Sequence, residues 1–492
     1  MLNSKSNTNL IYYSINSFIE KYYFIFFTLI TLVIGYICFK NLGALPVQDW
    51  DEARHGVSAY EMFKNNDYVV NTYNYSNDYW NLKPPMSFWA IIMFFKIFGV
   101  SIFSMRLYSA VSMFITICIV GLFIKKRYGR LESLISLVLF AASSPLYLSH
   151  MGRSGDADAM FVLFFTLSML SMMYIEKTKK ALYFSGFFFS LAFLTKSWHA
   201  FSIVAIGGLF LIFSGEIRKL KIKKWILFIS SFVVPISGWI VARIYKDGTY
   251  FLTEMVRYDL LERSKNPLEG HNGSVWFYFK SMLYSNRVLM ITLIGVMAVS
   301  LILYYRDIKI KEYDTIALIL WIVVPFAVFT YAKTKIAWYI LPVYIPLYIV
   351  VARAIGKIMK DRRTFSFIKP IVIILILGVS AKEINFNISA VRNPSTELVQ
   401  NFISKNVSEN KEILSLNAYI EIENNQWSQG RLLVAEFSAD LLCKNGGIEE
   451  FIREQESSII IISEDNYNKN KDTVASLEIL SQDNGLYLLK NR

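Results

Sequence analysis

Long apolar runs separated by short polar stretches dominate residues 1–384 of the chain. A helix needs roughly 17 to 25 apolar residues to cross a hydrocarbon core about 30 Å thick. By that measure the pattern predicts eleven transmembrane helices, at about 22–40, 102–124, 132–149, 158–175, 181–197, 199–215, 225–243, 286–304, 314–332, 336–352 and 367–381. The fifth and sixth are separated only by residues 196–199, where we expect a tight hairpin.

Basic residues fall in every second loop between these runs. The five basic loops carry Lys125, Lys126, Arg127 and Arg130; Lys177, Lys179 and Lys180; Arg218, Lys219, Lys221, Lys223 and Lys224; Arg306, Lys309 and Lys311; and the residues from Arg353 to Arg363. Short loops rich in Lys and Arg stay on the cytoplasmic side of a membrane. The pattern therefore places the amino terminus inside and the carboxyl terminus outside.

Three large pieces then lie outside: a first loop at 41–101, a second at 244–285, and the hydrophilic residues 385–492. The last piece is expected to be a small α/β domain, with strands at 412–417, 432–437, 458–463 and 486–489 and helices at 395–404 and 448–454. In the first loop, the apolar stretch Met86–Phe98 is too short to span and is expected to lie in the interface. The predicted fold is a polytopic α-helical membrane protein with an extracytoplasmic α/β carboxyl-terminal domain.

Composition supports this fold class and narrows the partners. The 492 residues are 54% hydrophobic and only 18% charged, against roughly 25% charged in ordinary soluble domains. A net charge of +13 would suggest nucleic acid in a soluble protein. Here the basic residues lie between apolar runs, so topology explains the charge, and membrane lipids rather than nucleic acid are the expected surroundings.

The first outer loop carries two groups of candidate chemical residues. Asp51 and Glu52 follow the first span directly, with Arg54 beside them. These acids could simply be solvated. In the functional interpretation, a carboxylate at the interface accepts a proton from a hydroxyl nucleophile, and its partial burial raises its basicity. Arg54 could pair with a phosphate through its planar fork. Lys83, before two prolines, is either a snorkelling lysine or a point charge for a lipid phosphate.

Other outer connections add further polar candidates. An Asp that starts a helix is often only a cap, and aromatic residues at an interface are common. No histidine pair has metal-ligand spacing. The candidates are Arg153, Asp156 and Asp158 after the third span, Lys196 and His199 at the hairpin, His271 in the second long loop, and Lys333, Lys335 and Tyr339 after the ninth span.

These groups come from separate connections yet share one face of the bilayer, while the middles of the spans are nearly free of ionisable residues. Such convergence favours chemistry on a lipid-borne substrate. The alternative from another class is a flippase or transporter of a lipid-linked substrate. Transporters usually keep their charged residues near the bilayer midplane, which this sequence does not do.

Several of these segments resemble the GT-C integral-membrane glycosyltransferases, in particular the aminoarabinose lipid A transferases and protein O-mannosyltransferases. The resemblance spans residues 1 to about 382. Residues 51–54 resemble the acidic first-loop motif of the family, and residues 83–89 (Lys-Pro-Pro-Met-Ser-Phe-Trp) resemble its Lys-Pro-Pro-Leu-x-x-Trp signature. Weaker matches are Arg153 with Asp158-Ala159, Leu194-Thr195-Lys196, Lys335 with Tyr339-Ile340-Leu341-Pro342, and His271-Asn272-Gly273 with Trp276 and Tyr278.

The resemblance implies a polyprenyl-phosphate-sugar donor that is used at the extracytoplasmic side of a bacterial inner membrane. It implies that Asp51 is the catalytic acid, that Arg54, Lys83 and Lys335 contact the donor phosphate, and that Tyr339 lies beside it. Leu82 stands where aminoarabinose transferases carry a metal-associated Glu, so no metal ligand is carried over and a divalent metal stays an open alternative. Ser197 stands where the family has Gly.

The function expected from these residues is sugar transfer to an acceptor at the outer face, with lipid A or a related envelope glycolipid as acceptor. A protein hydroxyl or a wall polymer is the alternative acceptor. Residues 385–492 carry no motif that identifies either.

Overall fold

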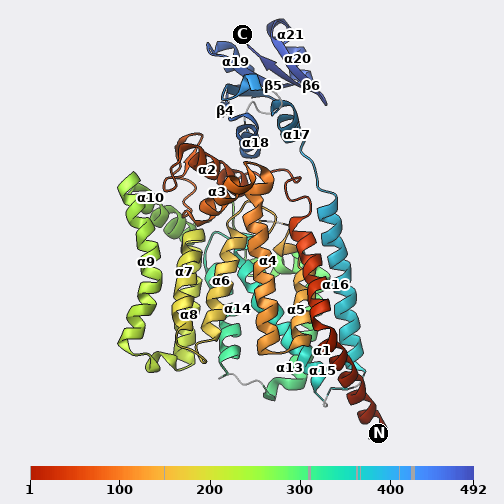
Figure 1. The fold of residues 1–492 in the computed structure, drawn as a ribbon. Helices are drawn as coiled ribbons and strands as arrows, with labels where there is room; N and C mark the ends of the chain where they lie inside the picture. The colour runs from red at the N-terminus through yellow and green to blue at the C-terminus, as the bar shows by residue number, and fades with distance from the viewer. Residues whose placement is uncertain are drawn as a thin grey trace.

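The computed structural model of the chain describes residues 2–148, 150–307, 312–361, 364–365, 367–408, 411–422 and 427–491. A bundle of long helices carries a cap formed by the first outer loop, and a small α/β domain sits on that cap (Figure 1). The amino terminus lies at the opposite end of the bundle from the carboxyl-terminal domain (Figure 1). Of the basic loop residues, Lys309, Lys311, Arg362 and Arg363 lie outside the described residues.

The protein is a multi-pass membrane protein. Eight stretches of the described chain are long and apolar enough to cross a membrane. Each expected span falls on a helix of the bundle: α1 (Leu2–Phe39), α4 (Ile102–Arg127), α5 (Arg130–Ala142), α6 (Asp158–Met173), α7 (Ala181–Lys196), α8 (Phe201–Phe213), α9 (Ile222–Asp247), α13 (Arg287–Tyr304), α14 (Tyr313–Tyr331), α15 (Tyr344–Lys360) and α16 (Ile368–Arg392). Helices α5 and α6 are shorter than the eight stretches, and α7 and α8 share one of them, Ala181–Phe213.

The hairpin expected at 196–199 joins α7 to α8. The chain breaks out of α7 at Ser197, where φ is 42°, and residues Ser197–Ala200 form one tight turn. Lys179, just before α7, pairs with Glu216, just after α8. Because the start of α7 and the end of α8 meet through this pair, the two helices run antiparallel.

The basic loops gather at one end of the bundle. Arg127 at the end of α4 binds Asp314 at the start of α14, with 2.8 Å between Nη2 and Oδ1, and also approaches Glu176 before α7. The Lys179–Glu216 pair links the connection before α7 to the one after α8 at the same end. Ion pairs that link successive basic loops are the arrangement expected if all of them face the same aqueous phase.

The cap consists of α2 (Asp51–Asn65), a two-stranded ribbon of β1 (Thr72–Tyr73) and β2 (Ser76–Asn77), and α3 (Met86–Phe98). The stretch expected to lie in the interface is therefore a helix with the same bounds. From the second long loop come α10 (Tyr250–Glu254), the wider turn Met255–Glu262, α11 (Arg263–Lys265) and α12 (Phe277–Ser285). After α14, the turn Ala337–Val343 leads into α15.

The carboxyl-terminal domain has a five-stranded mixed sheet in the order β4-β3-β5-β7-β6. Strand β3 pairs in parallel with β4 and β5, whereas β7 runs antiparallel to β5 and β6. Its elements are α17 (Leu398–Phe402), β3 (Asn417–Glu421), α18 (Gln429–Ala439), β4 (Leu442–Cys443), α19 (Gly447–Arg453), β5 (Ser458–Ser463), α20 (Glu464–Lys469), α21 (Lys471–Val474), β6 (Glu478–Asp483) and β7 (Leu486–Lys490).

Two of the expected strands of this domain are wrong. Residues 432–437 lie inside helix α18, because a short apolar run fits a buried helix as well as a strand. The Ser428 side chain accepts the Arg431 N–H and so caps a helix there. Residues 412–417 precede the true strand, which begins at Asn417. Helix α16 also continues to Arg392, past the domain boundary expected at residue 384.

The domain packs on the cap through a shared apolar core. Val57 of α2 and Phe95 of α3 belong to the same buried cluster as Leu433 of α18 and Ile459 of β5. The two helices approach closely at Gly56, where an added Cβ would lie 2.7 Å from the Leu433 side chain. Helix α18 therefore rests directly on the helix that begins with Asp51.

Two carboxyl groups are buried in this contact, Glu61 of α2 and Glu436 of α18, with side chains 0% and 1% exposed. Burial, together with the neighbouring Glu61 charge, raises the pKa of Glu436 well above its ordinary value. Burial also raises the pKa of Glu61. The neutral acids are therefore favoured in the folded protein, whereas in the unfolded chain both groups ionise at their ordinary pKa.

Replacing Glu436 with Gln should stabilise the protein above the ordinary glutamate pKa. The wild-type protein loses stability as pH rises from that value toward the raised folded-state pKa, because folding then has to keep a carboxyl protonated. We expect the apparent Tm in detergent to exceed that of the wild type by more at pH 8 than at pH 5. Glu478→Gln, at an exposed position, is the control, and an equal Tm difference at both pH values would contradict the prediction.

Candidate functional site

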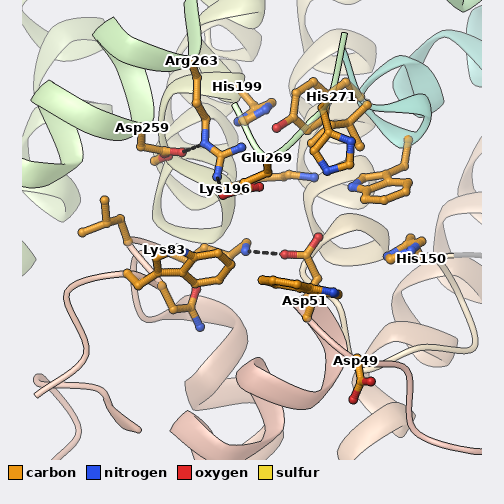
Figure 2. Close-up of a pocket in the computed structure, with 18 residues that line it drawn as sticks. Asp49, Asp51, Lys83, His150, Lys196, His199, Asp259, Arg263, Glu269 and His271 are labelled. Carbon is orange, nitrogen blue, oxygen red and sulfur yellow. Dashed lines mark hydrogen bonds and ion pairs between the residues drawn. The ribbon is translucent and has the colours of Figure 1, made fainter. Parts of the chain in front are cut away.

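A cavity of about 490 Å³ lies between the cap and the adjacent ends of the bundle helices. Figure 2 shows that side chains from distant parts of the chain point into it. It is lined by Asp49, Trp50, Asp51, Trp80, Asn81, Leu82, Lys83, His150, Lys196, Ser197, His199, Asp259, Arg263, Glu269, His271, Ile336, Trp338 and Tyr339. Of the residues predicted from sequence, the cavity therefore brings together Asp51, Lys83, Lys196, His199, His271 and Tyr339.

Asp51 and Lys83 form an ion pair in the cavity wall. Asp51 is the first residue of α2, and Lys83 stands just before the prolines that lead into α3. The Lys83 Nζ lies 3.3 Å from Asp51 Oδ1 (Figure 2). Both side chains keep partial exposure, 24% for Lys83 and 28% for Asp51, so each can meet a ligand that enters the cavity.

The sequence predicts a raised basicity for Asp51, but the pKa of this carboxyl is lowered in the structure. Burial by itself would raise the pKa of this carboxyl, but the positive charges of Lys83, Lys196 and His150 outweigh burial and hold the pKa well below its usual range. The pKa of Lys83 is raised, because Asp51 and other nearby acids overcome the opposing effect of its burial. The pair is fully ionised at neutral pH.

Glu52 does not face the cavity. Its side chain is 0% exposed. Its carboxylate accepts hydrogen bonds from Nε (2.6 Å) and Nη2 (2.8 Å) of Arg106 in α4. It also accepts the N–H of Gly155 at 2.7 Å and that of Gln48 at 3.0 Å. Glu52 therefore fastens the first loop to α4 and to the loop before α6.

Arg54 is held by protein groups and does not line the cavity. Its Nε and Nη2 bind the two oxygens of Asp78 at 3.0 and 2.8 Å. The guanidinium also lies 4.1 Å from the Tyr73 ring centroid and 4.6 Å from that of Trp80. These contacts bind its fork to a carboxylate and place the guanidinium against two aromatic rings, so Arg54 belongs to the framework of the first loop.

Two of the predicted residues around the start of α6, Arg153 and Asp158, bind other protein groups and do not line the cavity. Arg153 donates to the carbonyls of Ile37, Cys38 and Asn41 and so satisfies the free carbonyls at the end of α1. Asp158 receives Lys196 Nζ at 2.5 Å, with both side chains buried. None of these groups except Lys196 lines the cavity.

Asp156 acts on the cavity through His150, which the sequence did not mark. His150 Nδ1 lies 2.8 Å from Asp156 Oδ2, and its ring stacks on Trp338 with centroids 3.7 Å apart. Burial lowers the pKa of His150, but Asp156 and other acids outweigh this effect and raise it. Asp156 and Trp338 together fix the plane of the imidazole at the edge of the cavity.

Asp51, His150 and Asp156 offer ligand atoms within 4.8 Å of one another. In the structure these groups belong to an ion-pair network, in which Asp51 pairs with Lys83 and His150 pairs with Asp156. A His that binds a carboxylate through one ring nitrogen is also the usual arrangement of a metal ligand. A divalent metal therefore stays an open alternative at this cluster.

The two lysines after α14 stay outside the cavity lining. Lys335 Nζ donates to the carbonyls of Thr330 at 2.5 Å and Ala332 at 2.7 Å, and so caps the end of α14. Lys333 is exposed. The backbone N–H groups of Lys333 and Lys335 donate to the carbonyls of Ser264 and His271. This connection therefore holds the second long loop in place.

Arg263 and Asp259 are cavity residues that the sequence did not indicate. They lie in the second long loop, with 3.2 Å between Arg263 Nε and Asp259 Oδ1. Asp259 Oδ2 also accepts the Ser197 hydroxyl at 2.9 Å, and Glu269 Oε1 lies 3.3 Å from Arg263 Nη2. Figure 2 shows Arg263 on the side of the cavity across from Lys83. The cavity thus holds cationic groups on opposite walls.

A family model described as dolichyl-phosphate-mannose-protein mannosyltransferase matches residues 82–241. The undecaprenyl phosphate-alpha-4-amino-4-deoxy-L-arabinose arabinosyl transferase of Wigglesworthia glossinidia brevipalpis is 26% identical over 69% of this chain and 61% of its own length. An uncharacterized protein of Aquifex aeolicus is 29% identical over 48% of this chain and 53% of its own length. The chain thus matches less than two thirds of the length of these curated relatives.

Two solved structures share the fold. ArnT from Cupriavidus metallidurans bound to undecaprenyl phosphate has a TM-score of 0.67 and 13% identity, over 95% of this chain and 98% of that chain. The oligosaccharyltransferase of Archaeoglobus fulgidus has a TM-score of 0.52 and 11% identity, over 92% of this chain and 71% of that chain. Together with the sequence matches, these structures confirm the resemblance to GT-C glycosyltransferases of the aminoarabinose transferase type.

Removing the partner of buried Glu52 should destabilise the whole protein. Arg106→Met leaves a carboxylate without a counter-charge, which typically costs about 3–5 kcal/mol. We expect a lower yield in membranes and a lower apparent Tm in detergent. Arg453→Met removes an exposed ion pair, in which Arg453 is 68% exposed, and should change stability by less than about 1 kcal/mol. Equal Tm values for the two variants would refute the role given to the Glu52–Arg106 pair.

Proposed function

We propose, from the relationship to GT-C glycosyltransferases of the aminoarabinose transferase type, that the protein transfers a sugar from a polyprenyl-phosphate-linked donor to an acceptor. The observation that carries this proposal is the cavity in which Asp51 and Lys83 face Arg263. A phosphate needs cations, and a hydroxyl nucleophile needs a proton acceptor. The cavity offers both within the reach of one lipid headgroup.

We place this cavity at the extracytoplasmic face of a bacterial inner membrane, with eleven spans, the amino terminus inside and the carboxyl terminus outside. The gathering of the basic loops at one end of the bundle supports this orientation. The cap and the cavity lie at the other end of the helices (Figure 1). A donor held in the outer leaflet would present its headgroup at this depth.

In the proposed reaction, Lys83 and Arg263 bind the donor phosphate, with Tyr339 beside it. The acceptor oxygen bonds to the anomeric carbon, the bond from that carbon to the phosphate oxygen breaks, and the acceptor proton passes to Asp51. Attack opposite the leaving phosphate inverts the anomeric configuration. Negative charge grows on the phosphate as it departs, and fixed cations stabilise such charge in the transition state.

Donor binding would also activate Asp51. In the structure, Lys83 is the largest of the charges that lower the pKa of Asp51. A phosphate that engages the Lys83 ammonium offsets that charge, so the proton affinity of the carboxylate rises when the acceptor needs a base. Asp158 supports the site by holding Lys196, with 2.5 Å between the charged atoms.

Asp51→Asn and Lys83→Met should each lower transferase turnover by on the order of 10²-fold or more, because each removes a group that acts on charge in the transition state. Rates are measured in membranes with a polyprenyl-phosphate sugar, after matching protein levels. Lys333→Met is the matched control, since this lysine is exposed and does not line the cavity. Near wild-type turnover of Asp51→Asn with intact expression would rule out its assignment.

Deletion of the gene should remove a sugar from lipid A or a related envelope glycolipid, the acceptor that we favour. Mass spectrometry of lipid A, glycans and proteins from the deletion strain measures this change. Loss of a sugar from proteins or from a wall polymer would instead identify the alternative acceptor. If no glycoconjugate loses a sugar while the lipid-linked sugar moves less across the membrane, the protein is a flippase.

A further inference from the structure

The carboxyl-terminal domain forms hydrogen bonds with residues 47–50, which directly precede Asp51. Gln400 of α17 bonds to both backbone polar groups of one residue: its Oε1 accepts the Val47 N–H at 2.8 Å, and its Nε2 donates to the Val47 carbonyl at 2.9 Å. The Gln400 side chain is 8% exposed. An amide held in this way fixes the backbone at Val47 as a neighbouring strand would.

The start of α18 holds the next residues of the same segment. Gln429 Oε1 accepts the Trp50 N–H at 2.8 Å, and the Gly430 N–H donates to Asp49 Oδ1 at 2.6 Å. An added Cβ at Gly430 would lie 2.8 Å from the Val47 carbonyl oxygen. The two chains approach so closely here that only glycine fits without a shift.

The backbone between these contacts is strained. Trp50 has φ 70° and ψ −112°, a conformation that residues with a side chain rarely adopt. Such conformations persist where surrounding contacts hold them, and they cluster at functional sites. Asp51 is the next residue and begins α2. The direction of its carboxylate therefore depends on how Trp50 is held.

The domain does not reach the cavity itself. Within the described part of residues 393–491, no side chain lines it. Any effect of the domain on the reaction must therefore pass through its contacts with the first outer loop. Among these contacts, those with segment 47–50 lie next to Asp51.

We propose that the carboxyl-terminal domain is a positioning element of the active site, in which Gln400 and Gln429 are positioning residues that hold Asp51 in the cavity. This inference rests on the proposed transferase function for its catalytic consequence. It assigns the domain a role in presenting the carboxylate, through hydrogen bonds to the backbone of the first loop.

The test uses the full chain and a matched pair of variants at Gln429. Gln429→Met keeps the size of the side chain but cannot accept the Trp50 N–H, whereas Gln429→Glu still can. For Gln429→Met we expect kcat to fall by on the order of tenfold, because small misplacements of a catalytic group are costly. The donor KM should stay within about twofold, since Lys83 and Arg263 remain in place. Gln429→Glu should restore kcat.

Hydrogen exchange read by mass spectrometry gives a second measurement that needs no turnover. In Gln429→Met, exchange should rise in peptides covering residues 47–53 and stay unchanged in α18. If Gln429→Met keeps both the wild-type kcat and the wild-type exchange, or if Gln429→Glu loses as much kcat as Gln429→Met, the inference is overturned. If the wild type transfers no sugar but the exchange contrast appears, the proposed function fails and the positioning role stands.

Discussion

The buried pair of Glu52 and Arg106 holds together the first outer loop, α4 and the loop before α6, which form one side of the cavity. A carboxylate and a guanidinium that are 0% and 1% exposed are tolerated only if every charge is neutralised and most polar atoms are bonded. That demand is met by atoms from the first loop, from α4 and from the loop before α6. One interaction therefore fixes the relative position of the segments that carry Asp51 and Asp156.

The cavity walls carry acidic and basic side chains in close pairs, and this pairing decides how the cavity can bind an anion. Lys83 is balanced by Asp51, and Arg263 by Asp259, but both pairs are open to the cavity and easily shared with a ligand. Each cation is thus neutralised by a carboxylate of the cavity wall. In the proposed reaction, an anion competes with Asp51 and Asp259 for these cations, so the same charges couple its binding to the activation of the carboxylate.

The sequence predicted the helices and six of the eighteen residues that line the cavity, and local pattern explains which six. Asp51 and Lys83 stand at the borders of apolar runs, where a short motif can be read. Arg54 stands in the same motif, but its partner Asp78 lies 24 residues away and could not be foreseen from spacing. Arg263 occurs in a loop rich in charges of both signs, where local sequence does not separate a cavity residue from a solvated one.

The carboxyl-terminal domain shows the same limit. Strand β5 was predicted at its true bounds because a run of four isoleucines flanked by serines has few alternatives. The prediction of a strand at 432–437 is wrong because the helix there buries its apolar side against α2, and no local pattern reveals that contact. Burial against elements that are distant in the chain therefore cannot be predicted from the local sequence.

The contacts of Gln400 and Gly430 with the first loop join residues 353 and 381 positions apart. During synthesis, the segment before Asp51 leaves the ribosome long before its partners exist. In the proposed orientation, the intervening helices enter the membrane and the terminal domain crosses it before those hydrogen bonds form. The geometry proposed for Asp51 is then completed only at the end of biogenesis.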